Sequence, residues 1–293
     1  MADDRENDRP GGKGRDRRGP AATGRGRSVV GGERRGAAGR RGAQPDRAGR
    51  RVERGRPPAD RDDSRADPPT DPDVTGRELD DEVRSELGTL SGGAAGAVAR
   101  HLVMAGRLLD DDPALAYRHA LAARRRAARV GVVREAAGVA AYAAGRYADA
   151  LAELRAARRI TGSAAYLPMM ADSERGLGRP RRALDLAADP AVAGLDIADR
   201  MEMLIVAAGA RRDLGQLESA AVSLQVPELR AGVNQPWVAR LRYAYADALV
   251  ALGRVEEARR WFLKAAEADH DEQTDAAERI GEIDAAAATP GER

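Results

Sequence analysis

The sequence contains no cysteine and very few aromatic residues. Without cysteine the chain can form neither disulfides nor thiolate zinc sites. Only 3% of its 293 residues are aromatic, and the first of them is Tyr117. The N-terminal third therefore has almost no large side chains from which to build a hydrophobic core. β-Branched residues are also sparse, which argues against a substantial sheet and favours an all-α fold.

Long apolar runs are missing as well. No uninterrupted run approaches the about 20 residues that a helix needs to cross a bilayer. The first residues, MADDRENDRPGGKGR, are charged and lack the apolar segment of a secretory signal. From these two absences we expect a cytoplasmic protein that does not associate with a membrane.

Residues 1–76 form a low-complexity stretch rich in Arg, Gly and Pro. From Arg9 to Arg56 there are 16 basic and 4 acidic residues, although the formal net charge of the whole chain is only +2. High charge and missing aromatics leave too little apolar area to offset the entropy cost of ordering this backbone. We therefore expect a disordered tail over 1–76, a helical repeat domain over 77–288 and a frayed C-terminus over 289–293.

Helical periodicity begins directly after this tail. Leu79, Val83 and Leu87 recur every four residues, which predicts a short amphipathic leader helix. Asp112 followed by Pro113 predicts the start of a later helix, because Asp caps a helix well and Pro fits its first turn.

Five helix-turn-helix units can be aligned along the rest of the chain. The middle of each second helix has a small residue, and successive ones are 34, 33, 37 and 38 positions apart: Ala116, Ala150, Ala183, Ala220 and Ala258. The first helix of each of the last four units is closed by a glycine: Gly145, Gly178, Gly215 and Gly253. Glycine adopts the left-handed backbone at a helix end with little cost, and alanine lets two helices approach closely. The last unit, YADALVALGRVEEARRWFLKAAEAD, is the clearest copy.

This pattern resembles the tetratricopeptide repeat, a helix-turn-helix unit of about 34 residues, as found in proteins of high-GC (actinobacterial) type. The resemblance covers about residues 97–269. It implies an α-solenoid of about five helix pairs, with a leader helix in front and a capping helix at Ala276, Ile280 and Ile283. Pro190 and Pro227 depart from the pattern and predict short second helices in the third and fourth units.

In this family the first helices of successive pairs line a concave groove that binds a peptide or protein. Carried over to this chain, the expected groove residues are Glu135, Tyr142, Asp172, Arg175, Glu202, Arg212, Arg240, Tyr243 and Asp247. The resemblance thus predicts a non-enzymatic interaction or scaffold protein without a cofactor. The identity of its partner does not follow from the sequence.

The Arg-rich tail leaves a second function open. Disordered Arg-rich segments gain affinity for RNA through phosphate contacts and counterion release. No aromatic residue interleaves with the arginines of residues 9–56 to stack on bases, so we expect any contact with RNA or ribosomes to be weak and nonspecific. A solvated linker is the alternative for the same residues.

The three histidines are the remaining candidates for chemistry. His270 lies among acidic residues in a predicted loop, where a solvated connection explains it better than a metal site. We expect His119 to be a surface or partly buried helical residue. His101 is expected on the helix face that looks into the groove. The sequence therefore predicts no metal site and no catalytic residue.

Overall fold

The computed structural model describes residues 66–232 and 235–288, and this part of the chain is all-α. It contains twelve α-helices: α1 Asp81–Leu87, α2 Gly93–Arg107, α3 Pro113–Ala127, α4 Gly131–Ala143, α5 Tyr147–Thr161, α6 Leu167–Gly176, α7 Pro180–Ala187, α8 Ile197–Asp213, α9 Leu217–Ser223, α10 Pro236–Ala251, α11 Val255–Ala268 and α12 Ala276–Ala288. Two 3-10 helices, η1 Pro190–Gly194 and η2 Pro227–Arg230, follow α7 and α9. No helix in these ranges has the length and apolar character of a membrane span. Residues 1–65 of the tail expected over 1–76, and the C-terminus expected over 289–293, lie outside the described residues.

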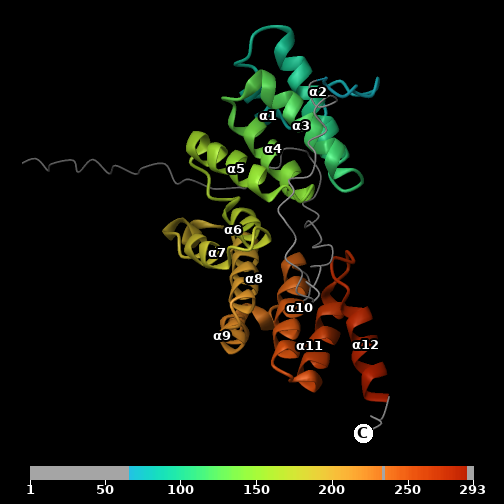
Figure 1. The fold of residues 1–293 in the computed structure, drawn as a ribbon. Helices are drawn as coiled ribbons and strands as arrows, with labels where there is room; N and C mark the ends of the chain where they lie inside the picture. Colours follow the sequence, from blue (N-terminus) through green and yellow to red (C-terminus); the bar gives the residue numbers. More distant parts are fainter. Residues whose placement is uncertain (1–65, 233–234, 289–293) are drawn as a thin grey trace, which may run out of the picture.

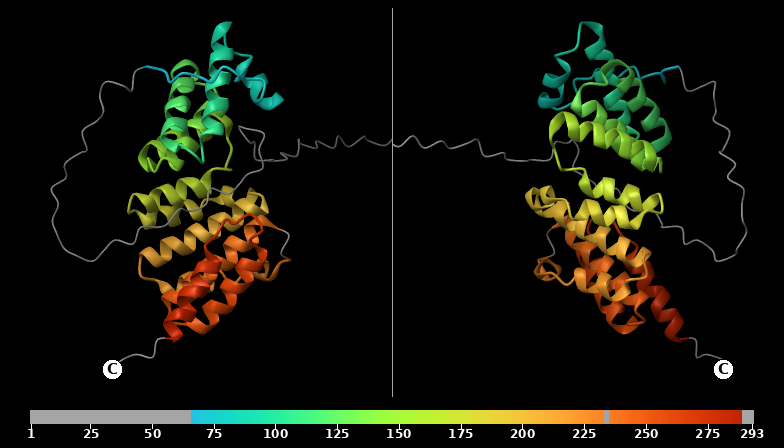
Figure 2. Two further views of the ribbon diagram at one scale, coloured as in Figure 1. Left: turned by 90° about the vertical axis from the view of Figure 1, so that its right-hand side faces the viewer. Right: turned by 60° about the vertical axis from the view of Figure 1, so that its left-hand side comes forward.

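Helices that follow one another in the chain also pack against one another. Five pairs result, namely α2 with α3, α4 with α5, α6 with α7, α8 with α9, and α10 with α11. The second helix of one pair contacts the first helix of the next, as α3 does with α4 and α7 with α8. Figure 1 shows the pairs in chain order from one end of the molecule to the other, and the two views of Figure 2 show the same order.

The turn inside a pair has the same hydrogen bonds in the last four pairs. After α4, the amide of Gly145 donates to the carbonyl of Tyr142 at 2.9 Å, and the amide of Arg146 donates to the carbonyl of Ala141 at 2.8 Å. These two bonds define a Schellman motif, which requires a left-handed residue after the helix. The same two bonds recur at the other three turns, and φ lies between 68° and 75° at Gly145, Gly178, Gly215 and Gly253. The predicted role of the four glycines is confirmed.

Small residues let the two helices of a pair cross closely. The five aligned alanines are all 0% exposed: Ala116, Ala150, Ala183, Ala220 and Ala258. Gly138 of α4 faces Leu154 of α5 so closely that a Cβ on Gly138 would lie 2.5 Å from the Leu154 side chain. Larger residues such as Leu154 and Phe262 are buried beside these crossings and fill the core.

The second helices of the third and fourth pairs are short, as the prolines predict. α7 has 8 residues and α9 has 7, whereas α3 and α5 have 15 each. Pro190 begins η1 and Pro227 begins η2, so the chain leaves the helical path after α7 and α9. These truncations leave the side of α8 between α7 and α9 without full-length neighbours.

Additional helices stand at both ends of the paired region. α1 buries Val83 and Leu87, which confirms the predicted leader helix for these two residues, whereas Leu79 lies before α1 and is buried there. α12 packs on α11 and buries Ala276, which confirms the predicted capping helix. The start of α3 is also as predicted, because the Asp112 side chain accepts a hydrogen bond of 3.0 Å from the amide of Leu115.

The packed chain begins earlier than the expected boundary at residue 77. Val74 is 3% exposed and belongs to the same hydrophobic cluster as α1 and α2. Asp67 forms ion pairs with Arg125 and Arg126 of α3. Residues 66–76 therefore lie against the first helix pair, held by a few contacts that a low-complexity composition does not reveal.

His101 of α2 and His119 of α3 are buried against each other, with exposures of 6% and 0%. Their Nδ1 atoms are 3.0 Å apart. The expected positions, in the groove for His101 and at or near the surface for His119, are therefore wrong. Both rings occupy the interface between α2 and α3, where each helix is rotated so that its histidine faces the partner helix. Two ring nitrogens at this distance share one proton, so one neutral ring donates to the other.

Gly138→Ala should destabilise the protein by about 1–3 kcal/mol, because the added methyl overlaps Leu154 at the α4–α5 crossing. Gly281→Ala in α12 is the matched control, since a Cβ there meets nothing within 4 Å. A helix gains up to about 1 kcal/mol from such a change where space allows. Urea denaturation measures both effects. Equal stabilisation by the two substitutions would contradict the close crossing.

The free energy of unfolding should fall as the pH is lowered from 6.5 to 4. Burial lowers the pKa of His119 from 6.5 to about 4, and the charge of His101 acts in the same direction. In this window the unfolded chain binds a proton that the folded chain excludes, so stability present above pH 6.5 is lost toward pH 4. The expected loss is on the order of 2–3 kcal/mol.

The difference between wild type and His119→Gln isolates this contribution from that of the carboxylates. His270→Gln, at an exposed loop position, is the control for removing a histidine. Chemical denaturation at a series of pH values gives the comparison. An unchanged pH slope in His119→Gln would show that the pair does not control acid stability.

Candidate functional site

A chain of polar contacts connects the first helices of the second, third and fourth pairs. The hydroxyl of Tyr142 on α4 donates to Asp172 Oδ2 on α6 at 2.6 Å. Asp172 Oδ1 accepts from Arg175 Nη1 at 2.8 Å, one turn further along α6. Arg175 then donates through Nε to Asp213 Oδ2 on α8, also at 2.8 Å. These three contacts join α4, α6 and α8 near their C-terminal ends.

The contacts continue from α8 to the end of the molecule. Arg212, next to Asp213 in the chain, pairs with Asp247 of α10. Asp247 also lies 3.6 Å from Arg279 Nη2 of α12. Nearer the N-terminal ends of the helices, Arg240 of α10 donates to Glu202 Oε1 of α8 at 2.7 Å. We call this set the polar ladder: Tyr142, Asp172, Arg175, Glu202, Arg212, Asp213, Arg240, Asp247 and Arg279.

The expected groove residues all lie on first helices, and seven of the nine belong to the ladder. The other two are Glu135 and Tyr243. Glu135 of α4 is 5% exposed, with the hydroxyl of Tyr166 3.5 Å from its Oε2. Tyr243 of α10 packs edge-on against Phe262 at a ring distance of 5.3 Å.

Asp213 and Arg279 are ladder members that sequence reasoning missed. Asp213 lies 38 positions after Arg175, one more than the 37-residue spacing between the third and fourth units, so the repeat register points to its neighbour Arg212 instead. Arg279 belongs to α12, outside the aligned repeats, so no repeat spacing points to it.

Gly209 of α8 makes room for one step of the ladder. A Cβ on Gly209 would lie 2.5 Å from Arg175 Cζ. The guanidinium of Arg175 therefore lies against the backbone of α8 on its way to Asp213. Any larger residue at this position would push Arg175 away from its partner.

Ladder side chains are partly exposed and mutually neutralised. The exposed fraction is 26% for Arg175, 34% for Glu202 and 24% for Asp247. Burial raises the pKa of Glu202 above the usual glutamate value, and Arg240 acts in the opposite direction. Burial also raises the pKa of Tyr142, with the charge of Asp172 adding to the effect. The surface thus offers polar groups that already have partners and that a ligand could reach.

In the described ranges, no group of three or more His, Asp or Glu side chains could hold a metal ion. The remaining chemistry of the ladder is hydrogen bonding and ion pairing. Such groups can exchange an intramolecular partner for a ligand without any covalent step.

No protein-family model, no curated protein and no solved structure matches this chain. The likeness to tetratricopeptide repeats therefore depends on the spacing of the small residues, the four glycine turns and the sequential packing of the helix pairs.

A double-mutant cycle of Arg175→Ala and Asp213→Ala should give a coupling energy of about 0.5–1 kcal/mol. The pair joins two helices, and its side chains are 26% and 39% exposed, so the coupling should shrink as salt is added. Urea denaturation at two salt concentrations provides the measurement. Arg146, the residue before α5, and Asp149 in its first turn pair at 58% and 43% exposure, and they form the control cycle with a smaller coupling. If the coupling energy between Arg175 and Asp213 is zero, this ladder contact does not stabilise the packing of successive helix pairs.

Proposed function

We propose that this chain is a tetratricopeptide-like α-solenoid that acts as a non-enzymatic interaction or scaffold protein. The observation that carries the proposal is the polar ladder, which extends over the first helices of four successive pairs and onto α12. In solenoid proteins an extended surface of this kind receives an extended ligand. The repeated glycine turns and the sequential packing support the same conclusion.

The proposed ligand is a peptide or protein segment of mixed charge that lies across α6, α8 and α10. Its carboxylates would pair with arginines of the ladder, such as Arg175 and Arg240. Its basic side chains would pair with acids such as Asp213 and Glu202. Because each ladder charge already has a partner, exchange contributes little net free energy. We therefore expect micromolar binding that weakens with salt.

The alternative proposal is nonspecific binding of RNA or ribosomes by residues 9–56, which lie outside the described residues. The described part of the chain carries 35 acidic and 29 basic residues, an excess of negative charge that disfavours contact with phosphates. RNA affinity would therefore have to come from the tail.

Selection from a random linear peptide library on the immobilised full-length protein tests the leading proposal. Bound peptides should lose at least about tenfold in affinity with the charge-swapped variant Glu202→Arg/Arg240→Glu. The swap keeps an attractive pair between α8 and α10 but inverts the charges that a ligand meets. Arg260→Glu, at an exposed position of α11, is the control and should leave binding unchanged.

A library that yields no binders, or binders that ignore the charge swap, would contradict the proposal. The alternative, RNA binding by the tail, is tested by measuring RNA affinity over a salt series. The measurement compares the full-length protein with a variant that carries Arg→Gln substitutions throughout residues 9–56. Salt-sensitive RNA binding that disappears in this variant would favour the tail as the functional segment.

A further inference from the structure

A pocket of about 560 Å³ opens on the side of α8 that faces away from the polar ladder. Four of its lining residues recur at i, i+4, i+7 and i+11 and therefore share one face of α8: Arg200, Leu204, Ala207 and Arg211. We call this set the α8 stripe. By the same periodicity, the ladder residues Glu202 and Asp213 lie on the other side of α8. The pocket and the ladder are thus separate surfaces.

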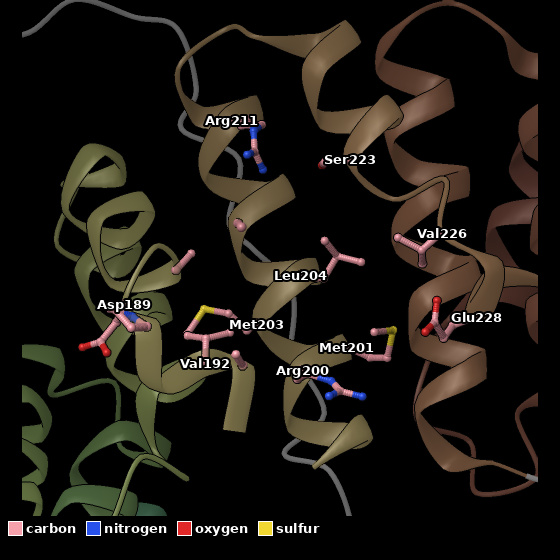
Figure 3. A pocket seen from close by; sticks show the side chains of 14 residues that line it. Asp189, Val192, Arg200, Met201, Met203, Leu204, Arg211, Ser223, Val226 and Glu228 are labelled. Atoms are coloured by element: carbon pink, nitrogen blue, oxygen red, sulfur yellow. The ribbon is translucent and has the colours of Figure 1, made fainter. Parts of the chain in front are cut away.

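The pocket exists because the neighbouring second helices stop early. α7 and α9 have 8 and 7 residues, against 15 in α3 and in α5, which pack on both sides of α4. At 1.5 Å per residue each short helix lacks about 10 Å, or two turns. η1 and η2 replace the missing turns and form the two walls of the pocket, with α8 between them (Figure 3).

The floor of the pocket is apolar and adaptable. Met201 and Met203 line it and are themselves buried, with exposures of 7% and 2%. Figure 3 shows Leu204 pointing toward Val226 on the η2 side and Met203 lying near Val192 on the η1 side. Methionine side chains are flexible and polarisable, and they adapt to the shape of an incoming apolar group.

The ends of the α8 stripe carry two arginines whose side chains have no partner among the described residues. The guanidinium groups of Arg200 and Arg211 form no ion pair or hydrogen bond there, whereas every ladder arginine is paired through its side chain. They are 11 residues apart on one helix face, which corresponds to about 16 Å. Of the acids in the pocket lining, Asp189 pairs with Arg158 at 2.9 Å, and the carboxylate of Glu228 on η2 has no partner among the residues that the structure describes.

We propose that this pocket is a docking site for a short, acidic amphipathic helix of a partner protein. Its apolar side chains pack on Met201, Met203 and Leu204, and acidic side chains at its two ends pair with Arg200 and Arg211. A helix placed there covers the face of α8 that lies between η1 and η2. Charge complementarity identifies the occupant as acidic, and the separation of the two arginines sets its length at about three turns. A basic residue on the flank of the helix would face Glu228.

The test uses a capped helical peptide of about 12 residues, with glutamates at positions i and i+11 and leucines between them on the same face. A matched peptide carries lysine at the same two positions. Fluorescence anisotropy measures the binding of each peptide to the full-length protein. The glutamate peptide should bind at least about tenfold more tightly than the lysine peptide. With Arg200→Glu/Arg211→Glu this preference should be inverted.

Arg212→Glu is the matched control, since Arg212 is next to the stripe in the chain but belongs to the ladder. It should leave the affinity for the glutamate peptide unchanged. Circular dichroism verifies the fold of each variant. If charge reversal disturbs folding, Arg200→Gln/Arg211→Gln replaces it and should abolish the preference for the glutamate peptide.

Five outcomes would overturn the proposal. The first is the absence of binding, and the second is equal binding of the two peptides. A loss of binding in Arg212→Glu would place the peptide on the ladder instead. If dodecanedioate binds and the peptide does not, the pocket is a site for a small amphiphilic anion. If the chain self-associates in sedimentation and this requires Arg200 and Arg211, the pocket is a site for a second copy of the chain.

Discussion

The close crossing of two helices through small side chains is the interaction on which the rest of this structure depends. At the α4–α5 crossing, Gly138 leaves room only for Leu154, and the aligned alanines of all five pairs are fully buried. A chain with one phenylalanine and two tryptophans cannot build a core from large aromatic residues. It buries apolar area instead by bringing helix backbones close together, so that leucines and a single Phe262 fill the remaining space.

Two surfaces follow from how this packing repeats and where it is interrupted. Regular repetition brings the first helices near enough for single side chains to connect them, which produces the polar ladder from Tyr142 to Arg279. Interruption by Pro190 and Pro227 shortens two second helices and opens a pocket along the α8 stripe. One helix thus contributes to both surfaces, because an α-helix presents different residues every 100° around its axis.

Most of the helix order could be predicted from the sequence, whereas most of the partners in the candidate site could not. Gly145 and its three counterparts were predictable because a Schellman turn depends on a few consecutive residues. The expected groove residues do lie on first helices, but their partners, such as Asp213 for Arg175, come from the next repeat. The histidines show the limit most clearly, since nothing near His101 in the chain indicates that it meets His119.

The sequence by itself determined the all-α class, the leader and capping helices, the glycine turns and the shortened second helices. These features depend on local backbone preferences and on hydrophobic periodicity within one segment. Only the tertiary structure decided which charges pair in the ladder, which histidines contact each other, that residues 66–76 pack on the first helix pair, and that a pocket opens beside α8. Each of these depends on the rotation of one helix against another, which is set by the simultaneous packing of residues far apart in the chain.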